Sequence, residues 1–407
     1  MYESSQRLSS AGKYYGLAVV TVLNFLNYID RYIIAAVLPR MQTELGLTNT
    51  EAGFLATAFL IAYFITSPLF GALGDRFSRT RLMALGVGAW SVATAATGVM
   101  RSFGQLIIAR SFVGIGEAAY GTISPALLSD YFPKSQRGRT FAIFYVAIPV
   151  GAAVGYLLGG LIEPALGWRI AFYVVGVPGI LMAALALTIV DPPRGSAEES
   201  ISTAQPLGTT LRGFARNFAY TGTVLGYASY TFAVSGLAFW MPKYLEEVRA
   251  MDLSRANFLV GTVTVVAGLL GTFVGGYLGD LVSPRIRHGQ LWICGLSSIT
   301  AIIPTWLALT TASSPGYGIW LFVAEFFLFL STGPVNVVIV SVVPIAARAM
   351  AMAVSIFTIH LLGDAISPPI IGAIADKATL TTAVLIVPLT VALSGLLWIT
   401  TAIKTGE

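Results

Sequence analysis

Apolar stretches of about 20 residues alternate with shorter polar segments along almost the whole chain. An α-helix needs about 20 residues to cross about 30 Å of hydrocarbon, so each stretch is long enough to span a membrane. Dividing the stretches at glycines, prolines and charges predicts twelve membrane-spanning helices. Their expected limits are 15–38, 52–73, 82–100, 104–130, 139–162, 170–190, 219–245, 256–279, 290–310, 317–343, 348–373 and 381–402.

The composition supports this interpretation. Hydrophobic residues make up 56% of the 407 residues and charged residues only 11%, with a mean hydropathy of +0.78. A soluble domain has roughly 25% charged residues, and a soluble fold of this composition would expose large apolar patches. We therefore expect an all-α integral membrane protein, and we exclude a nucleic-acid-binding protein, a secreted protein and a cytosolic enzyme.

The residues that bind metals or perform redox chemistry are scarce. Cys294 is the one cysteine, and His288 and His360 are too few for a zinc cluster. The sequence also lacks the Gly-x-x-x-x-Gly-Lys-Ser/Thr loop that binds ATP phosphates. We expect neither an enzyme nor a cofactor-dependent or ATP-driven protein.

The basic residues are distributed unevenly between the two sides of the membrane. If the N-terminus is cytoplasmic, fifteen of the 24 Lys and Arg residues fall in inner segments, seven in outer loops and two within spans. Cytoplasmic loops of membrane proteins carry an excess of Lys and Arg. The sequence thus predicts a multi-pass protein of the cell membrane, the inner membrane if the source is bacterial, with both termini in the cytoplasm.

The longest connection, 191–218, lies in the middle of the chain. It contains a polar run, Ser196–Gln205, followed by Leu207, Leu211 and Phe214 at helical spacing. This spacing predicts a short helix lying in the inner interface, with an ordinary solvated linker as the alternative. The expected organisation is an N-terminal six-helix bundle at 1–190, the linker at 191–218 and a C-terminal six-helix bundle at 219–407.

Several ionisable residues fall inside the predicted spans. A charge at the bilayer centre costs at least about 2.5 kcal/mol, so each one is a candidate for a functional site. Neighbouring helical residues point about 100° apart, whereas residues four or seven apart share a face. The candidates are Asp30, Arg31, Arg110, Glu117, Glu325, His360 and Asp364.

A short motif occurs twice, 205 residues apart. Gly71-Ala72-Leu73-Gly74-Asp75 ends the second predicted helix, and Gly276-Tyr277-Leu278-Gly279-Asp280 ends the eighth. The same motif at the same helix end, separated by half the chain, indicates two homologous halves, as in transporters built from repeats.

With these residues the sequence resembles the major facilitator superfamily. The loop after the second helix supplies Gly71, Leu73, Asp75 and the basic residues of the family signature, although Ser78 stands where the family usually has glycine. The resemblance implies two pseudo-symmetric six-helix bundles that transport by alternating access. It also implies a conformational gate at the inner membrane face, with a topology-setting basic loop as the alternative. The expected gating residues are Gly71, Asp75, Arg76, Arg79, Arg81 and Asp280.

A narrower resemblance is to the spinster branch of that superfamily. It rests on three segments: Asn27-Tyr28-Ile29-Asp30-Arg31, Gly114-Ile115-Gly116-Glu117-Ala118 and Asp130-Tyr131-Phe132-Pro133. The resemblance implies a sphingolipid or lysophospholipid as substrate, with proton coupling. A proton-coupled carrier of a small organic anion or drug is the alternative. The expected partners are this small amphipathic substrate, protons and membrane lipids, with no nucleic acid, and the chain is expected to act as a monomer.

The resemblance also implies roles for the buried charges, because helices 1, 4, 7 and 10 line the cavity in this superfamily. Arg31 and Glu117 are expected to pair, which leaves Asp30 as the proton carrier and Glu117 as a second candidate. A static salt bridge that fixes helix packing is the alternative. The expected substrate-binding residues are Arg31, Arg110, Glu117, Glu325, His360 and Asp364. The aromatic residues of helix 7, Tyr230, Phe232, Phe239 and Trp240, are expected either to contact an acyl chain or to pack against other helices.

Overall fold

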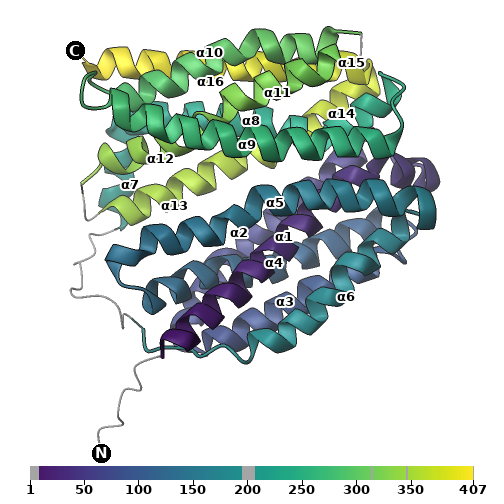
Figure 1. Cartoon of the computed structure of the whole chain (residues 1–407), viewed down its shortest axis with the longest axis horizontal. Helices are drawn as coiled ribbons and strands as arrows, with labels where there is room; N and C mark the ends of the chain where they lie inside the picture. Colours follow the sequence, from purple (N-terminus) through teal and green to yellow (C-terminus); the bar gives the residue numbers. More distant parts are fainter. Residues whose placement is uncertain (1–8, 195–206, 313–314, 345–346, 407) are drawn as a thin grey trace, which may run out of the picture. The chain divides into compact units, whose positions relative to one another are not determined.

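The computed structural model describes residues 9–194, 207–312, 315–344 and 347–406, and all the regular structure within these ranges is helical (Figure 1). Eleven helices or continuous helical runs in this part are long and apolar enough to cross a membrane. The remaining predicted span corresponds to α3 (Arg79–Thr97), which begins with two arginines in its first turn. The all-α membrane architecture expected from the sequence is confirmed.

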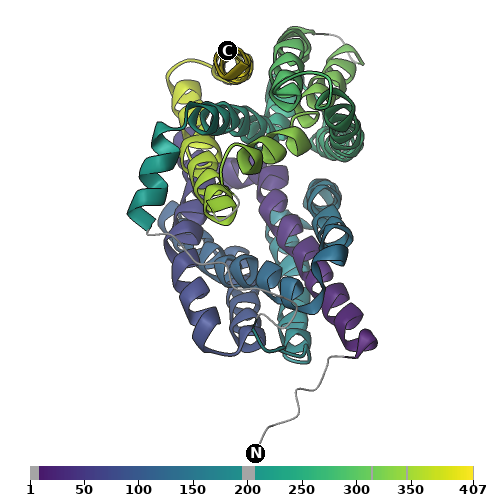
Figure 2. The same ribbon diagram turned by 90° about the vertical axis from the view of Figure 1, so that its left-hand side faces the viewer.

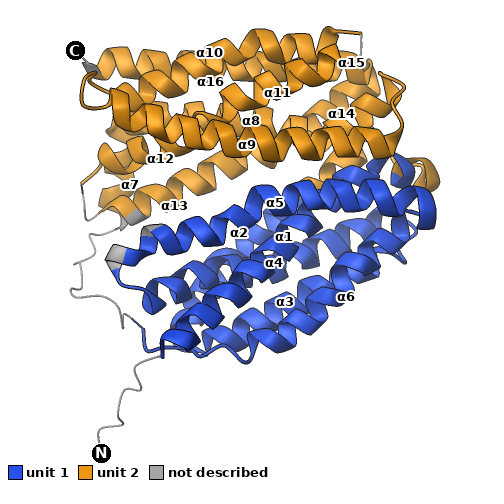
Figure 3. Ribbon diagram, viewed as in Figure 1, with its two compact units in different colours: residues 1–41, 58–201 blue, residues 42–57, 202–407 orange. Residues whose placement is uncertain are grey.

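Contacts within the chain divide it into two units: residues 1–41 and 58–201, and residues 42–57 and 202–407 (Figure 3). The first six helices are α1 (Ser10–Leu45), α2 (Asn49–Arg76), α3, α4 (Phe103–Tyr131), α5 (Lys134–Leu166) and α6 (Trp168–Ala186). Most extend beyond their predicted limits, because polar residues at their ends continue the helices outside the apolar stretches.

Glycines allow close helix packing in unit 1. A Cβ atom at Gly151 or Gly155 of α5 would lie 2.7 or 2.8 Å from a backbone oxygen of α1. Gly86 of α3 and Gly116 of α4 face each other in the same way, since a Cβ atom on either would lie 2.5–2.6 Å from the other's carbonyl oxygen. Such contacts bring helix backbones together in membranes, and they hold α1 and α4, which carry most of the buried charges of unit 1, at fixed positions.

Unit 2 contains shorter helical segments, and several of its helices are seen end-on in Figure 2. Three predicted spans are each divided, the tenth into α11 and α12, the eleventh around a π-helix, and the twelfth into α15 and α16. The elements are α7 (Leu207–Arg216), α8 (Phe218–Glu247), α9 (Leu253–Val282), α10 (Gly289–Thr310), α11 (Gly316–Phe329), α12 (Thr332–Ser341), α13 (Arg348–Ile359), the π-helix η2 (His360–Asp364), α14 (Ser367–Lys377), α15 (Leu380–Val384) and α16 (Ile386–Gly406).

The short helix α7 begins within the predicted linker and is strongly amphipathic. It runs crosswise to α8, which follows it (Figure 2). Its Phe214 is buried and stacks on Tyr220 of α8, with 4.7 Å between ring centroids, while Arg212 and Arg216 are exposed. The polar run Ser196–Gln205 lies outside the described residues, and the placement of α7 in the membrane interface stays a prediction.

Residues 42–57, which join α1 to α2, group with unit 2 rather than with the expected N-terminal bundle. Asp376 of α14 accepts the backbone N–H groups of Asn49 and Thr50, at 2.9 and 2.8 Å, and so satisfies the N-terminus of α2. Buried Lys243 of α8 donates to the side-chain oxygens of Gln42 and Asn49 at 2.7 and 2.6 Å. Residues distant in sequence make these contacts, so the local pattern gave no signal for them.

Candidate substrate and proton site

The centre of the site in unit 1 is an ion pair between α1 and α4. Arg31 donates from Nε to Oε2 of Glu117 at 2.7 Å, and the Glu117 side chain is fully buried. The pair expected from the sequence is therefore present. Because Glu117 is inaccessible and Arg31 keeps 22% of its side chain exposed, the pair has one buried end and one partly accessible end.

Three aromatic rings surround the Arg31 guanidinium. Its Cζ atom lies 5.0 Å from the ring centroids of Tyr28 and Phe59 and 5.4 Å from that of Tyr63. A cation within about 6 Å of an aromatic face is stabilised by the quadrupole of the ring. Sequence analysis missed Phe59 and Tyr63, because nothing in α2 marks which of its many aromatic residues faces a charge.

Asp30 makes its hydrogen bond outside this pair, with α3. The residue is 1% exposed, and its Oδ2 accepts a hydrogen bond from the hydroxyl of Thr94 in α3 at 2.5 Å. Its Oδ1 has no hydrogen-bond partner among the described residues. Asp30 is thus a buried carboxyl bound by one neutral donor and by no cation in this part of the chain.

Arg110 of α4 is also buried, at 3% exposure. Its Cζ atom lies 5.0 Å from the Phe59 ring centroid, its Nε has no hydrogen-bond partner, and it forms no ion pair with a described residue. It is close enough to Asp30 and Glu117 for electrostatic attraction. A guanidinium with open donors can bind an oxyanion through two parallel hydrogen bonds.

The start of α3, directly after the loop from α2, contains a buried arginine with two ion pairs. Arg79 is buried and pairs with Asp130 at 2.5 Å and with Asp191 at 2.8 Å, and both partners belong to its own unit. In these contacts Arg79 holds α3, α4 and the segment after α6 together, and its expected role in the gate stays a prediction. The other charged gating candidates, Asp75, Arg76 and Arg81, are exposed.

A polar pocket of about 430 Å³ lies beside this network. Gly71, Asp75 and Arg79 contribute to its wall, together with Asp130 and Arg194. The Arg194 guanidinium donates to the carbonyl oxygens of the α2 end, so this part of the loop has a built structure instead of being a simple run of basic residues.

Unit 2 contains the remaining candidates. His360 and Asp364 form a hydrogen bond of 2.7 Å between Nδ1 and Oδ2, and they mark the two ends of the π-helix. Such π-helical turns are frequent at functional sites. Glu325 in α11 is buried and accepts a hydrogen bond from Thr264 of α9 at 3.4 Å. Asp280 is exposed at the end of α9.

Comparison with known proteins identifies the family. A model described as Major Facilitator Superfamily matches residues 20–368. The chain is 32% identical to the sphingosine-1-phosphate transporter SPNS2 of Danio rerio, over 93% of this chain and 82% of that protein. It belongs to the spinster family of the major facilitator superfamily. It is also 35% identical to Protein spinster of Drosophila melanogaster, over 91% of this chain and 63% of that protein's length.

A crystal structure of a bacterial homologue of the human lysosomal transporter spinster, in an inward-facing and unoccupied conformation, has the same fold. Its TM-score is 0.89 at 22% sequence identity, and the match covers 98% of both chains. Membership of the spinster family, together with the long apolar helices, makes this protein a multi-pass membrane transporter rather than an enzyme. Among the described residues no group of three or more His, Cys, Asp or Glu side chains is placed to hold a metal ion.

The aromatic residues of α8 pack inside unit 2. Tyr230, Phe232, Phe239 and Trp240 are all buried, and Trp240 donates to the carbonyl oxygen of Pro368 at 3.1 Å. Of the two expected roles for these residues, the structure favours packing between helices.

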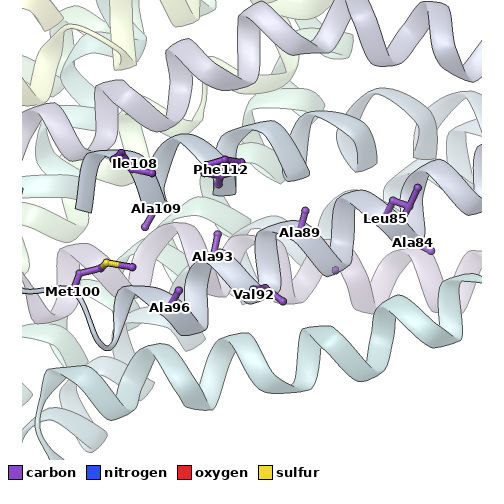
Figure 4. A pocket seen from close by; sticks show the side chains of 11 residues that line it. Ala84, Leu85, Ala89, Val92, Ala93, Ala96, Met100, Ile108, Ala109 and Phe112 are labelled. Atoms are coloured by element: carbon purple, nitrogen blue, oxygen red, sulfur yellow. The ribbon is translucent and has the colours of Figure 1, made fainter. Parts of the chain in front are cut away.

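An apolar groove of about 570 Å³ lies along α3 and α4 of the transporter (Figure 4). Leu85, Val92 and Met100 line it from α3 and its end, and Ile108 and Phe112 from α4. With no charged side chain in its wall, the groove offers nothing to bind a polar head group. The charge cluster of α1 and α4 remains the best candidate for that role.

Proposed function

We propose that this spinster-type transporter is a proton-coupled carrier of an amphipathic lipid with an anionic head group, of the sphingolipid or lysophospholipid class. It works by alternating access as a monomer in the cell membrane, with both termini in the cytoplasm. The proposal rests on two buried residues, Asp30 and Arg110. Their carboxyl and guanidinium groups lie in the same cluster, and neither forms an ion pair with a described residue. The name of the SPNS2 relative supports the lipid class.

Arg110 is the proposed head-group site. Its Nε has no hydrogen-bond partner among the described residues and the residue is buried, so an incoming phosphate or carboxylate would supply the charge-assisted contact that the guanidinium lacks. Arg31 is committed to Glu117 and keeps a partly exposed edge, which suits a secondary contact with the same head group.

Asp30 is the proposed coupling carboxyl, with Glu117 as a second proton site. The cluster contains two guanidinium groups and two carboxyl groups, so it is neutral when all four are ionised. An anion bound at Arg110 adds one negative charge in a region of low dielectric, where uncompensated charge is costly. A proton on Asp30 restores neutrality, and anion binding and proton uptake therefore favour each other.

In unit 2, His360, Asp364 and Glu325 are proposed to contact other polar groups of the substrate. The histidine suits a phosphate or hydroxyl, the Asp364 carboxylate suits an ammonium group, and the Glu325 carboxyl suits a hydroxyl or amide. The hydrogen bond between His360 and Asp364 fixes the orientation of the imidazole ring for such a contact.

The proposed gate consists of the exposed charges Asp75, Arg76, Arg81 and Asp280, with Gly71 at the start of the motif. These charges are accessible for contacts that form and break during the transport cycle. Arg79 supports the gate indirectly, because its two ion pairs fix the shape of the loop that presents the others.

The test is transport by the purified protein in liposomes, with a labelled lysophospholipid or sphingoid phosphate and with or without an imposed pH gradient. We expect gradient-dependent movement in the wild type. Asp30→Asn should abolish the dependence on the gradient while binding persists. Arg110→Gln should weaken binding, whereas Arg101→Gln, an exposed arginine of the same unit, should change neither.

The second candidate function is proton-coupled transport of a small organic anion or drug. The open guanidinium of Arg110 favours it equally, because the contact requires only an oxyanion. If the wild type moves no lipid but changes the internal pH when small organic anions are added, the lipid assignment is wrong and this alternative holds.

A further inference from the structure

Unit 2 buries an acidic side chain in an almost wholly apolar setting. Glu325 lies in the second half of α11 at 8% exposure, and Leu321, Ala324 and Leu328 of the same helix are at most 1% exposed. Ionised carboxyl groups are stable inside proteins when a cation or several hydrogen-bond donors compensate the charge. The groups around Glu325 therefore determine whether its carboxyl group is ionised or protonated.

Glu325 has one polar contact among the described residues. The Thr264 hydroxyl donates to Oε1 at 3.4 Å, which is long for a hydrogen bond between oxygens. Oε2 is buried and has no hydrogen-bond partner. One weak neutral donor leaves a carboxylate charge uncompensated.

No charged residue of the neighbouring helices is near enough to supply the compensation. The sequences of α10, α11 and α12 contain no other Asp, Glu, Lys, Arg or His. In α9, Arg255 lies nine residues before Thr264 and Asp280 lies sixteen residues after it. At 1.5 Å per residue these separations are about 13 and 24 Å along the helix.

The other titratable groups on this side of unit 2 are neutral or already bound. Tyr230 of α8 is in electrostatic contact with Glu325, and Cys294 of α10 is buried with its sulfur 3.9 Å from the Ser331 carbonyl oxygen. Tyr277 is farther along α9 and exposed. Lys243 of α8 donates to Gln42 and Asn49. Arg249, which follows α8, has its Cζ atom 6.0 Å from the ring centroid of Tyr317 at the start of α11 and donates to the Leu309 carbonyl oxygen.

We propose that Glu325 is a further proton-binding carboxyl of this transporter, separate from those of unit 1, protonated at neutral pH and able to exchange its proton with water. The neutral acid fits each contact, since Thr264 donates to Oε1 as the carbonyl oxygen and the proton resides on Oε2. Within the described part of the chain, Oε2 has no acceptor to retain that proton. A role for Glu325 in transport would rest on the proposed proton coupling. The presence of a proton on Glu325 does not depend on that proposal.

Infrared difference spectroscopy of the purified, reconstituted protein tests the proposal without any substrate. A protonated carboxyl group has a C=O stretching band that a carboxylate lacks. We expect the wild type at neutral pH to show a band that Glu325→Gln removes and that shifts to lower frequency in D2O. Thr264→Val should move the band to higher frequency, because the carbonyl loses its donor. Glu247→Gln, at an exposed position of unit 2, should leave the band unchanged.

The outcomes separate this inference from the proposed function. A spectrum with no band sensitive to Glu325→Gln overturns it, because Glu325 is then ionised. A band that does not shift in D2O overturns proton exchange. A band that behaves as expected in a protein that moves no lipid leaves the inference standing and removes the proposed substrate class instead.

Discussion

Arg31 and Glu117 form an ion pair, and we expect replacement of each residue alone to lower the stability of the protein by a different amount. Arg31→Gln leaves a fully buried carboxylate without its cation. Removing one partner of a buried pair costs about 3–5 kcal/mol of stability. Glu117→Gln leaves a guanidinium that is 22% exposed and lies against three aromatic rings. We expect this loss to be about 1.5–3 kcal/mol, the value of one hydrogen bond to a charged group.

The assay is equilibrium unfolding of the purified protein in mixed micelles with increasing SDS, followed by circular dichroism. The expected order of stability is wild type, then Glu117→Gln, then Arg31→Gln. The double variant should be more stable than Arg31→Gln alone, because neither charge is left unpaired. Lowering the pH should stabilise Arg31→Gln relative to the wild type, since protonation neutralises the abandoned carboxylate in the folded state.

The control is the ion pair between Arg40 and Glu163 of the same unit, at 3.2 Å, in which the arginine side chain is 45% exposed. Glu163→Gln, which leaves only this exposed arginine unpaired, should cost about 0–1 kcal/mol, as for other accessible charges. The reasoning is refuted if Glu117→Gln costs as much as Arg31→Gln, or if the two single effects simply add in the double variant.

Three further changes test other contacts. Gly116→Ala should destabilise the protein by about 1–3 kcal/mol through overpacking against α3, whereas Gly104→Ala in the same helix, where nothing lies within 4 Å, should be neutral or stabilising in the same unfolding assay. Asp376→Asn should cost about 1–2 kcal/mol and increase hydrogen exchange at the amide of Asn49, because the carboxylate that accepts this N–H is lost. Thr94→Val removes the one hydrogen bond to the buried carboxyl of α1, and it should change the pH dependence of transport without unfolding the chain.

Much of the architecture was predictable from hydropathy alone, because lipid forces long uninterrupted apolar helices on any chain that crosses it. The Arg31–Glu117 pair was also predictable, but only through the family resemblance that places helices 1 and 4 side by side. Periodicity shows which residues share a face of one helix, and it does not show which other helix that face meets.

The undetected contacts join residues that are distant in sequence. Thr94 binds Asp30 across 64 positions, and Asp376 binds Asn49 across 327. The π-helix at His360–Asp364 was not foreseen either, since its two end residues are four apart and satisfy an α-helical pattern equally well. Threonines and asparagines are also common in membrane helices as local hydrogen-bond donors, so their presence alone does not indicate a long-range partner.

Because the charges of the unit 1 cluster balance, the binding of a proton and the binding of an anionic substrate affect each other. If an anion at Arg110 favours a proton on Asp30, then the proton must favour the anion by the same factor, because the coupling free energy is shared. Couplings of this kind are typically about 5- to 150-fold. Equilibrium binding of a labelled lysophospholipid should therefore become tighter as the pH falls, and Asp30→Asn, which is permanently neutral, should bind tightly at every pH. Tight binding by Asp30→Asn that still varies with pH would mean that another group, such as the second proposed proton site Glu117, carries the coupled proton.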